Sequence, residues 1–487
     1  MVSLEGSLRW FSVWLPKRPE GSVMTLSTVD RYEPDQLGSV GERAVVIGGS
    51  IAGLSAARAL ADGFEEVIVL ERDPLPDEPV TRDGAPQTRH PHALLEAGRV
   101  TLEDLFPGFS ETVLSEGGLL VDTGTETVQY DEGGFLADTE ARLPTYCASR
   151  ALFEHVVRKQ VRDRPGVALR GNHQFTGYRT DDDASEVTGV TFRDPEGDET
   201  NLATDLVVDA TGRTSRTPTW LESHGYEAPP VDEVRIDVTY STIRIERPAT
   251  DRRIFLVPPS APRTRGAAFI PIENGQWEVI VQGVHGDDAP TEPAAFRNFV
   301  DSLPVDELGT LLDSQPWVSE GIEHYPYPSS RRHRYEDLDR FPEGLVVTGD
   351  AIASFNPIHG QGMSVAALDA VTLQQALADG GLDGIAGRFF DRVAAVVDDV
   401  WQMSTGADFD FPQTTGPKPT GTDLFNWYAS RLISRAHSDP ELSEAFRRVM
   451  RLEQAPTTLF RPRIVWRVLR PSFSRPRMPL GQGEPDV

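Results

Sequence analysis

RAVVIGGSIAGLSAARALADGFEEVIVLERD, residues 43–73, is the stretch that decides the fold. An apolar run predicts a strand, a glycine-rich turn follows it, an alanine-rich stretch predicts a helix, and a second apolar run ends in an acid. This order is a βαβ unit, whose helix N-terminus directs free backbone amides and the positive end of its dipole at the turn. The sequence therefore predicts an α/β domain that binds a dinucleotide there.

Two glycines of this turn have separate roles. Gly48 permits the tight turn after the strand, and Gly53 lets the helix approach the sheet. Ser50 stands where a second glycine is usual, but it is small and can donate a hydrogen bond. Glu71 follows the second strand, where a carboxylate binds ribose hydroxyls. A glycine-rich turn without a ligand is the alternative, and the joint occurrence of strand, turn, helix and acid argues against it. The predicted pyrophosphate-binding residues are Gly48, Gly49, Ser50, Ile51, Ala52 and Gly53.

Two later segments also place polar residues after a strand. In TDLVVDATGRT, residues 204–214, a predicted strand ends at Asp209, which suits a ligand at the carboxyl edge of a sheet. An ordinary turn without a ligand could have the same sequence and is the alternative. LVVTGDAIASFNPIHGQGMSVAALDA, residues 345–370, ends a strand at Gly349 and Asp350 and then begins a helix. Glycines at its start would let the backbone lie flat against a planar ligand, while the helix N-terminus stabilises negative charge. The residues at that helix start are Gly360, Gln361, Gly362 and Met363.

Arg150 begins a predicted helix in CASRALFEHVVRKQV, residues 147–161. A cation at a helix N-terminus opposes the dipole unless an anion or an acid lies nearby. Arg150 is therefore a candidate for contact with an anionic cofactor.

The motifs GGSIAGL, VLERD, SR at 149–150, DATG and GDAIASFNPIHGQGMSVAALDA resemble, in this order, the FAD-dependent monooxygenases of the p-hydroxybenzoate hydroxylase fold. The branch they resemble most is that of squalene epoxidase and the polyene epoxidases of polyether assembly. The likeness covers about residues 44–469, and WQMSTGADFDFP at 401–412 is similar to that branch as well.

This resemblance implies one bound FAD, with its pyrophosphate on the turn 48–53. The adenosine ribose would lie on Glu71 and Arg72, Arg150 would contact the cofactor, and Asp209 matches an acid that shapes the cofactor site. The resemblance places Gly349 and Asp350 at the pyrophosphate and ribitol, and residues 360–363 at the isoalloxazine.

Pro357 and His359 are the residues that the resemblance places at the substrate. Pro357 would lie over the flavin face, and His359 stands where relatives of this branch often carry Tyr. A histidine held only by its loop neighbours is the more frequent role for such a residue, and a role in substrate choice is the alternative.

The implied reaction uses NADPH or NADH to reduce FAD, after which O2 adds at flavin C4a and the hydroperoxide hydroxylates or epoxidises a small apolar substrate, isoprenoid, polyene or aromatic. No general base is assigned. Two rivals stay open: a flavin-dependent reductase of prenyl chains, and a non-catalytic FAD-binding or escort protein. A flavin halogenase is disfavoured because the sequence lacks the WxWxIP signature.

From residue 233 to 285 the apolar period changes to two, and FIPIENGQWEVIVQG predicts a hairpin with Asn274 and Gly275 at its turn. We therefore expect an α/β fold, mixed with α+β, in which a Rossmann-like FAD-binding domain adjoins an antiparallel substrate sheet and a C-terminal helical region. Met24 is an alternative start. The predicted domains are an N-terminal extension (1–40), a discontinuous FAD-binding domain (41–120, 148–218, 328–385), a substrate domain (121–147, 219–327) and a helical region (386–487).

The net charge of −28 makes nucleic acid a poor partner. Only three of the 47 basic residues are lysines, Lys17, Lys159 and Lys418. An acid excess with almost no lysine favours a halophilic source with a salt-rich cytoplasm, and arginine-rich codon usage is the alternative. Cys147 is the only cysteine, which is typical of a reducing, cytoplasmic location.

Three basic or histidine-containing segments allow two readings each. His90 and His92 invite a metal, but two histidines without a third ligand are more often loop residues, so no metal is predicted. RRHR at 331–334 could clamp a phosphate, although surface salt bridges are more common in so acidic a chain. Arg447 to Arg477 holds nine arginines and one acid, which suits either peripheral membrane contact or pairing with the acidic body. The oligomeric state is not predicted.

Overall fold

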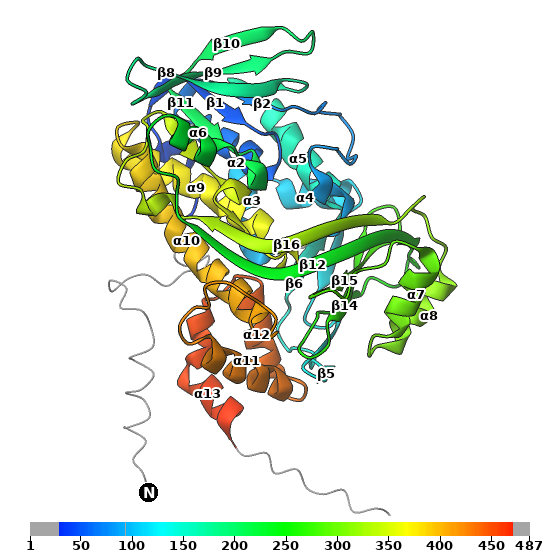
Figure 1. The fold of residues 1–487 in the computed structure, drawn as a ribbon. Helices are drawn as coiled ribbons and strands as arrows, with labels where there is room; N and C mark the ends of the chain where they lie inside the picture. The colour runs from blue at the N-terminus through cyan, green and yellow to red at the C-terminus, as the bar shows by residue number, and fades with distance from the viewer. Residues whose placement is uncertain (1–28, 93, 471–487) are drawn as a thin grey trace, which may run out of the picture.

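The computed structural model describes residues 29–92 and 94–470. Its first sheet has five parallel strands in the order β17-β11-β1-β2-β7 (Figure 1). The strands are β1 (Gly41–Ile47), β2 (Phe64–Leu70), β7 (Val167–Arg170), β11 (Leu206–Asp209) and β17 (Leu345–Val347). The chain is thus an α/β protein with the predicted βαβ unit at its centre.

Both faces of this sheet are covered, as expected of parallel strands. On β1, Ala44 and Val46 face the helices, while Val45 and Ile47 belong to the core beneath a small antiparallel sheet. The helices are α2 (Ile51–Leu60), α3 (Glu96–Leu105), α4 (Phe109–Ser115), α5 (Arg150–Arg162) and α9 (Gly362–Gly380). The small sheet consists of β8 (Gln174–Thr180), β9 (Val187–Arg193) and β10 (Glu199–Ala203), and α6 (Thr217–Ser223) lies beside it.

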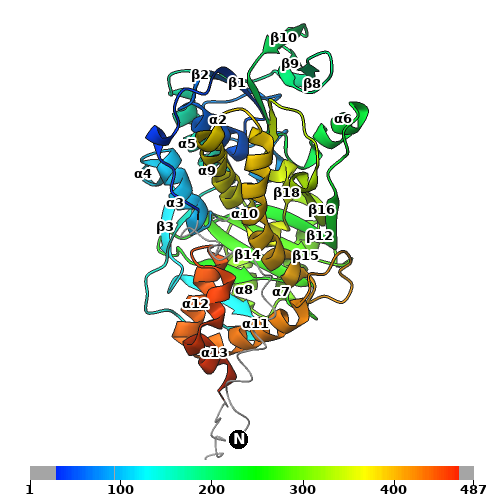
Figure 2. The same cartoon turned by 90° about the vertical axis from the view of Figure 1, so that its left-hand side faces the viewer.

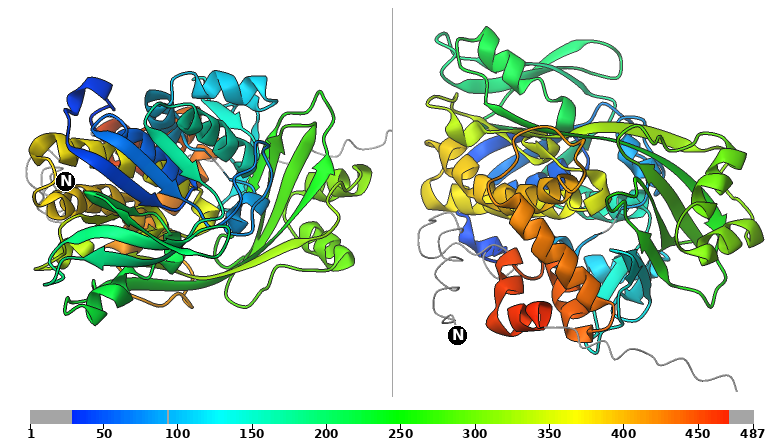
Figure 3. Two further views of the ribbon diagram at one scale, coloured as in Figure 1. Left: turned by 90° about the horizontal axis from the view of Figure 1, so that it is seen from above. Right: turned by 60° about the horizontal axis from the view of Figure 1, so that its bottom comes forward.

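A second, eight-stranded sheet has the order β18-β16-β12-β15-β14-β13-β4-β5. Its two longest strands, β12 (Val231–Glu246) and β16 (Glu323–His333), run antiparallel across the molecule (Figure 3). The predicted hairpin is confirmed, with Asn274 and Gly275 both at positive φ. The other strands are β4 (Thr127–Asp131), β5 (Gly134–Phe135), β13 (Ile254–Val257), β14 (Arg265–Ile272), β15 (Gln276–Gly283) and β18 (Ala353–Ser354).

One face of the eight-stranded sheet is closed by α7 (Pro293–Asp301) and α8 (Asp306–Ser314). The pair β3 (Leu119–Asp122) and β6 (Pro144–Cys147) packs on part of the opposite face, where Cys147 is buried. Burial raises the pKa of the Cys147 thiol to about 12.

The C-terminal helices form a separate core below both sheets (Figure 2). These helices are α11 (Thr422–Ala436), α12 (Pro440–Met450) and α13 (Pro462–Leu469). Helix α10 (Ile385–Asp408) leads from the cofactor domain toward them. None of the helices within residues 29–92 and 94–470 is long and apolar enough to cross a membrane.

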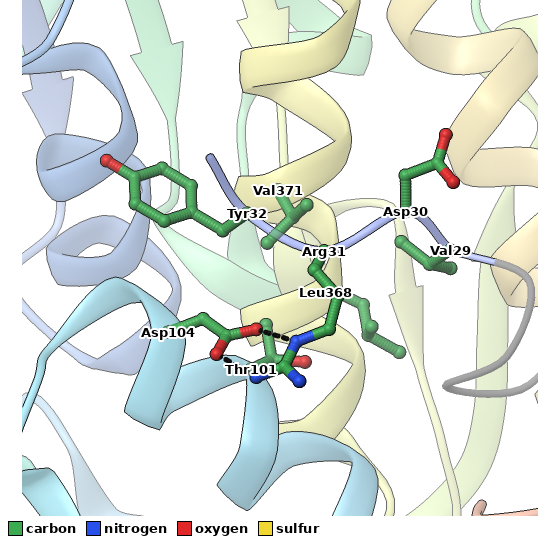
Figure 4. A pocket seen from close by; sticks show the side chains of 8 residues that line it. All are labelled: Val29, Asp30, Arg31, Tyr32, Thr101, Asp104, Leu368 and Val371. Carbon is green, nitrogen blue, oxygen red and sulfur yellow. Dashed lines mark hydrogen bonds and ion pairs between the residues drawn. The ribbon is translucent and has the colours of Figure 1, made fainter. Parts of the chain in front are cut away.

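Two predicted boundaries differ from the structure. Residues 29–40, assigned to the extension, pack on the cofactor domain: Tyr32 is buried and Arg31 pairs with Asp104 (Figure 4). Gln374 Nε2 also donates to Glu33 O at 2.8 Å. Met24 lies outside the described residues. The predicted boundary at 328 falls inside β16, because this strand pairs with β12 as far as His333.

Candidate active site

The glycines of the first turn are required by close backbone contacts. Gly48 has a φ of +110°, and a Cβ there would lie 2.5 Å from the carbonyl oxygen of Ala210. A Cβ on Gly53 would lie 1.9 Å from the carbonyl oxygen of Gly48. The turn therefore brings the start of α2 against β1, as the sequence predicts.

The N-terminus of α2 is open to a ligand. Ser50 is its N-cap residue, but the side chain makes no capping hydrogen bond to the helix. Its Oγ instead donates to Glu154 Oε2 at 2.7 Å and accepts from Arg150 Nη2 at 2.9 Å. The first-turn amides thus stay available to an anion. The hydrogen bond that Ser50 was expected to be able to donate goes to Glu154 in this structure.

Glu154 is the centre of a buried charge cluster beneath this turn. Only 1% of its side chain is exposed, and Oε1 accepts from Arg82 Nη2 at 2.6 Å and from Arg158 Nη1 at 3.3 Å. Oε2 lies 3.7 Å from Arg150. The sequence reasoning missed Arg82 and Glu154; the spacing of four between Arg150 and Glu154 was the one available signal.

Arg150 has capacity for a further anionic partner. Burial lowers its pKa, and the carboxylates of Glu154 and Asp350 oppose that shift. Its Nε is buried and has no hydrogen-bond partner among the residues that the structure describes. A buried guanidinium with an unused donor fits an anionic or carbonyl-bearing ligand.

Glu71 and Arg72 lie in different environments. Glu71 is buried at the end of β2, where Oε2 accepts from the Gly49 amide at 2.7 Å and Oε1 from the Asp73 amide at 3.0 Å. Arg72 directs a side chain that is 64% exposed toward Asp73, 3.9 Å away. The structure thus places Glu71 beside the turn and leaves Arg72 at the surface.

Asp209 fixes the loop that follows β11. It is buried, and its carboxylate accepts hydrogen bonds from Thr211, Ser215 and Thr217 at 2.5–2.9 Å. All of these contacts are with the protein, so Asp209 shapes the loop. Gly212 in this loop lies next to Asp350.

The second glycine-containing motif meets the first at Gly349. A Cβ on Gly349 would lie 2.8 Å from the Cβ of Ala52, and its amide donates to Asp369 Oδ2 at 3.0 Å. The neighbouring Asp350 has an exposed side chain. Surrounding protein atoms nevertheless raise its pKa, while Arg150 and Arg213 oppose the rise. Asp350 is thus accessible to solvent and also surrounded by protein atoms, as a carboxylate that lines a ligand site would be.

The start of α9 adjoins Asp350. Gly360 has a φ of +65° and ends the short helix η6 (Pro357–His359). A Cβ on Gly362 would lie 3.8 Å from Asp350 Oδ1. Gln361 is buried, and its Oε1 has no partner within the described part of the chain. Met363 is also buried and packs into the core.

Pro357 and His359 are at the exposed side of this loop. Pro357 is solvent-exposed. His359 Nε2 lies 3.3 Å from Asp408 Oδ1, at the end of α10. No motif in the sequence indicates Asp408 as the partner.

Arg213 is a further residue that the sequence reasoning did not name. Its guanidinium donates to Ser354 Oγ at 2.9 Å and to Ser329 Oγ at 3.0 Å, and lies 4.8 Å from the ring centre of Tyr327. These contacts join the loop after β11 to the eight-stranded sheet. Its place directly after Gly212 in the DATGR motif was the available signal.

The eight-stranded sheet turns a partly exposed apolar face toward the cofactor domain. Its alternate residues Leu256, Ala268, Ile270 and Ile280 are half-buried, and Leu256 and Ile270 pack against the β3–β6 pair. The residues between them are buried under α7 and α8. His90 connects this face to the cofactor domain: its Nδ1 lies 2.9 Å from Thr242 Oγ1 and its ring packs against Tyr240 at 4.7 Å.

His90 and His92 have separate partners. His92 Nδ1 donates to the carbonyl oxygen of His90 at 2.8 Å. Burial lowers the pKa of His90 to about 4 and that of His92 to about 3, so both rings are neutral near pH 7.

The RRHR arginines pair with acids. Arg331 lies 3.7 Å from Glu233, and Arg334 lies 2.6 Å from Asp232. Arg332 is fully buried and lies 2.6 Å from Glu336. The phosphate clamp is therefore not formed, although one of the salt bridges lies in the interior rather than on the surface.

Among the described arginines of the C-terminal segment, most are also paired. Arg448 and Arg451 contact Glu453, and Arg463 and Arg467 contact Glu441. Residues 471–477 lie outside the described part of the chain. Next to these ion pairs, Trp466 on α13 is 64% exposed.

Comparisons with known proteins agree with this architecture. A family model described as FAD binding domain matches residues 42–387. Protein Rv3254 of Mycobacterium tuberculosis is 32% identical over 434 residues, which cover 85% of this chain and 90% of that protein. The chain belongs to the FAD-binding domain family and is an FAD-dependent oxidoreductase.

Two solved structures share the fold. PqsL, a probable FAD-dependent monooxygenase from Pseudomonas aeruginosa, is 20% identical with a TM-score of 0.54, covering 76% of this chain and 97% of that one. PnpA, the p-nitrophenol 4-monooxygenase from Pseudomonas putida, is 17% identical with a TM-score of 0.57, covering 86% and 99%.

The residues of this site fit FAD. An uncapped helix N-terminus and a glycine turn suit the pyrophosphate, and the unpartnered donor of Arg150 suits an anion. Gly362 leaves backbone without a side chain beside Asp350. Glu71 contacts this turn at Gly49, and Gly349, which precedes Asp350, contacts it at Ala52.

Proposed function

We propose that this protein is a monooxygenase that uses NADPH or NADH and O2 to hydroxylate or epoxidise an apolar organic substrate. The observation that carries the proposal is the juxtaposition of Ala52 and Gly349, which joins the two cofactor motifs beside a partly exposed apolar sheet face. Bound FAD supplies the redox chemistry and the activation of oxygen.

The protein's own residues bind and position. The α2 N-terminus and Arg150 hold the anionic part of the cofactor, and Asp350 accepts from its hydroxyls. On the eight-stranded sheet, the half-buried side chains of Ala268 and Ile280 offer a surface that favours an apolar molecule and excludes water. Exclusion of water matters because an activated oxygen species is otherwise lost to solvent.

An isoprenoid, polyene or aromatic substrate fits this surface, and epoxidation in the manner of the squalene epoxidase branch is the more specific form of the proposal. Its support is the order of motifs from GGSIAGL to GDAIASFNPIHGQGM, together with the apolar sheet face. A cytoplasmic site of action is proposed from the single, buried cysteine.

Anaerobic and aerobic reduction tests the proposal. The protein, purified in concentrated KCl with FAD, is mixed with NADPH or NADH while the visible spectrum is recorded. We expect flavin bands that bleach without O2 and return with it, and 18O from 18O2 in the product of an accepted alkene or aromatic substrate. A protein that takes up no FAD, or ignores both nicotinamides, would contradict the proposal.

The same experiment separates the alternatives. A prenyl-chain reductase would bleach and reoxidise but would saturate a double bond and incorporate no 18O. A non-catalytic FAD-binding or escort protein would hold FAD and would not be reduced by NADPH or NADH.

We also propose that α13 makes peripheral contact with membranes. Trp466 and Leu469 are exposed on this helix beside Arg470, and aromatic residues next to arginine suit a lipid interface. Co-sedimentation with vesicles of anionic phospholipid tests this. Trp466→Ser should weaken sedimentation, whereas the equally substituted Trp427→Ser on α11 should not; no sedimentation of the parent protein would refute the contact.

A further inference from the structure

A hollow with a volume of about 230 Å³ lies between one face of α5 and the loop that follows β2. Every residue that lines this α5 hollow has an ionisable side chain, and the set is Asp77, His155, Arg158, Lys159, Arg162 and Asp163. The spacing of residues 155, 158, 159 and 162 places them on one face of the helix. Of the six, only Arg158 also contacts the buried cluster at Glu154.

Two arginines of the α5 hollow hold its opposite wall in place. Arg158 Nη2 donates to the carbonyl oxygen of Pro76 at 3.0 Å, and only 2% of the Arg158 side chain is exposed. Arg162 Nη2 donates to the carbonyl oxygen of Leu75 at 3.3 Å. These bonds fix the loop after β2 against α5, so the fold itself maintains the hollow.

Lys159 is the cation that these contacts leave over. Its side chain is exposed between the two arginines, and it has no hydrogen bond or ion pair within residues 29–92 and 94–470. The other lysine in this part of the chain, Lys418, pairs with Asp423. An ammonium group has three donors and no acceptor, so Lys159 is available to an anionic ligand.

The α5 hollow has a positive potential, although the whole chain carries a charge of −28. Burial lowers the pKa of His155, and the three neighbouring cations of α5 lower it further. The acid on the opposite wall, Asp77, pairs with Arg162, but 85% of the Asp77 side chain is exposed. An ion pair that exposed contributes about 0–1 kcal/mol, so a more highly charged anion can take the place of Asp77.

This competition with Asp77 indicates the class of ligand. A carboxylate from solution would carry no more charge than Asp77, which is already attached to the chain. A phosphate monoester carries about 1.5 to 2 negative charges near pH 7 and has three terminal oxygens. The volume of the α5 hollow is smaller than the roughly 300–1,000 Å³ of pockets that enclose a whole drug-sized ligand, so it suits one phosphate group with part of a sugar.

We propose that the α5 hollow binds a phosphate monoester, with Lys159 and Arg162 as the residues that contact it. Arg158 is a positioning residue, because it holds the wall and is itself buried. The inference goes beyond the proposed function, which assigns no role to this face of α5. The 2′-phosphate of NADPH and the phosphate of an independent small molecule share this chemistry, and comparison with the form of the dinucleotide that lacks the 2′-phosphate separates the two sources.

Lysine acetylation tests the proposal, because the chain has only three lysines, Lys17, Lys159 and Lys418. The FAD-loaded protein is treated with acetic anhydride at constant ionic strength in the presence of inorganic phosphate, NADP+ or NAD+, and peptide mass spectrometry follows each lysine. At a ligand concentration of about ten times its Kd, we expect Lys159 to react about tenfold more slowly and Lys418 to react as before. Protection by NADP+ but not by NAD+ identifies the 2′-phosphate, whereas protection by inorganic phosphate and not by NADP+ identifies an independent ligand.

A pair of matched variants provides a second measurement. Lys159→Gln should weaken the binding of inorganic phosphate, measured by isothermal titration calorimetry, about tenfold or more, as expected for the loss of a hydrogen bond between charged groups. Lys418→Gln makes the same change at a lysine outside the hollow and should leave the affinity unchanged. FAD uptake by both variants shows that they are folded.

Three results would overturn the inference. They are a Lys159 that none of the three probes protects, a phosphate affinity that is the same in Lys159→Gln as in the parent protein, and equal protection by NADP+ and NAD+, because the phosphates that these two share are not monoesters. Uptake of FAD and its reduction by NADPH or NADH, measured in the same preparation, test the proposed function separately, so either can fail without the other.

Discussion

Ser50 Oγ donates a hydrogen bond of 2.7 Å to Glu154 Oε2, which joins the cofactor-binding turn to the buried charges of α5. Glu154 has Arg82, Arg150 and Arg158 around it. The residue that replaces a glycine in the turn is therefore part of the ionic interior, and the cluster connects stability with cofactor binding.

Removing the carboxylate of Glu154 should destabilise the fold. Glu154→Ala leaves three buried arginines without their shared counter-ion, and breaking such a pair costs about 3–5 kcal/mol. Urea unfolding monitored by circular dichroism gives the free energy. Glu111→Ala, at an exposed position of α4, is the control and should change it by less than about 0.5 kcal/mol. Equal effects of the two substitutions would mean that the cluster contributes nothing to stability.

Gly53→Ala should abolish FAD binding. The new Cβ would lie 1.9 Å from the carbonyl oxygen of Gly48, and overpacking of this kind costs about 1–3 kcal/mol or more. The flavin absorbance retained per protein after gel filtration measures the effect. Gly387→Ala on α10 is the matched control, because its Cβ meets no atom within 4 Å and alanine favours a helix. A Gly53→Ala protein that retains FAD would show that the turn does not bind the cofactor.

The parts of the site that are local in sequence could be predicted, because strand, turn and helix each have their own signal. Gly48 and Gly53 lie within five residues of each other, and the turn follows from their spacing. The partners Arg82 and Glu154 are 72 residues apart, and His359 and Asp408 are 49 apart. No local pattern indicates such pairs, because they form only when the tertiary fold brings α5 to the turn and the end of α10 to the loop.

The stability of the cofactor-free protein should fall as pH rises from about 4 to about 7. Burial raises the pKa of Asp369 from 3.8 to about 7, so the folded state binds a proton that the unfolded state has released in this window. Asp369→Asn removes the charge and should flatten the dependence of the free energy of unfolding on pH in this window. Relative to the parent protein, the variant should therefore gain more stability at pH 8 than at pH 5. Urea unfolding at both pH values measures it. The same slope in parent and variant would rule out Asp369 as its source.

Potassium chloride should stabilise the protein. With a net charge of −28 the folded chain repels itself, and the screening length falls from about 10 Å at 0.1 M to about 3 Å at 1 M salt. We therefore expect the melting temperature to rise from 0.1 M to 1 M KCl. If the protein is adapted to a salt-rich cytoplasm, this rise should be larger. Some salts, sulfates among them, also stabilise proteins by strengthening hydrophobic burial. Tetramethylammonium chloride, which screens charge with a different cation, is therefore the control. A melting temperature that is unchanged or falls in both chlorides would show that self-repulsion does not limit stability and would remove the main support for a halophilic source.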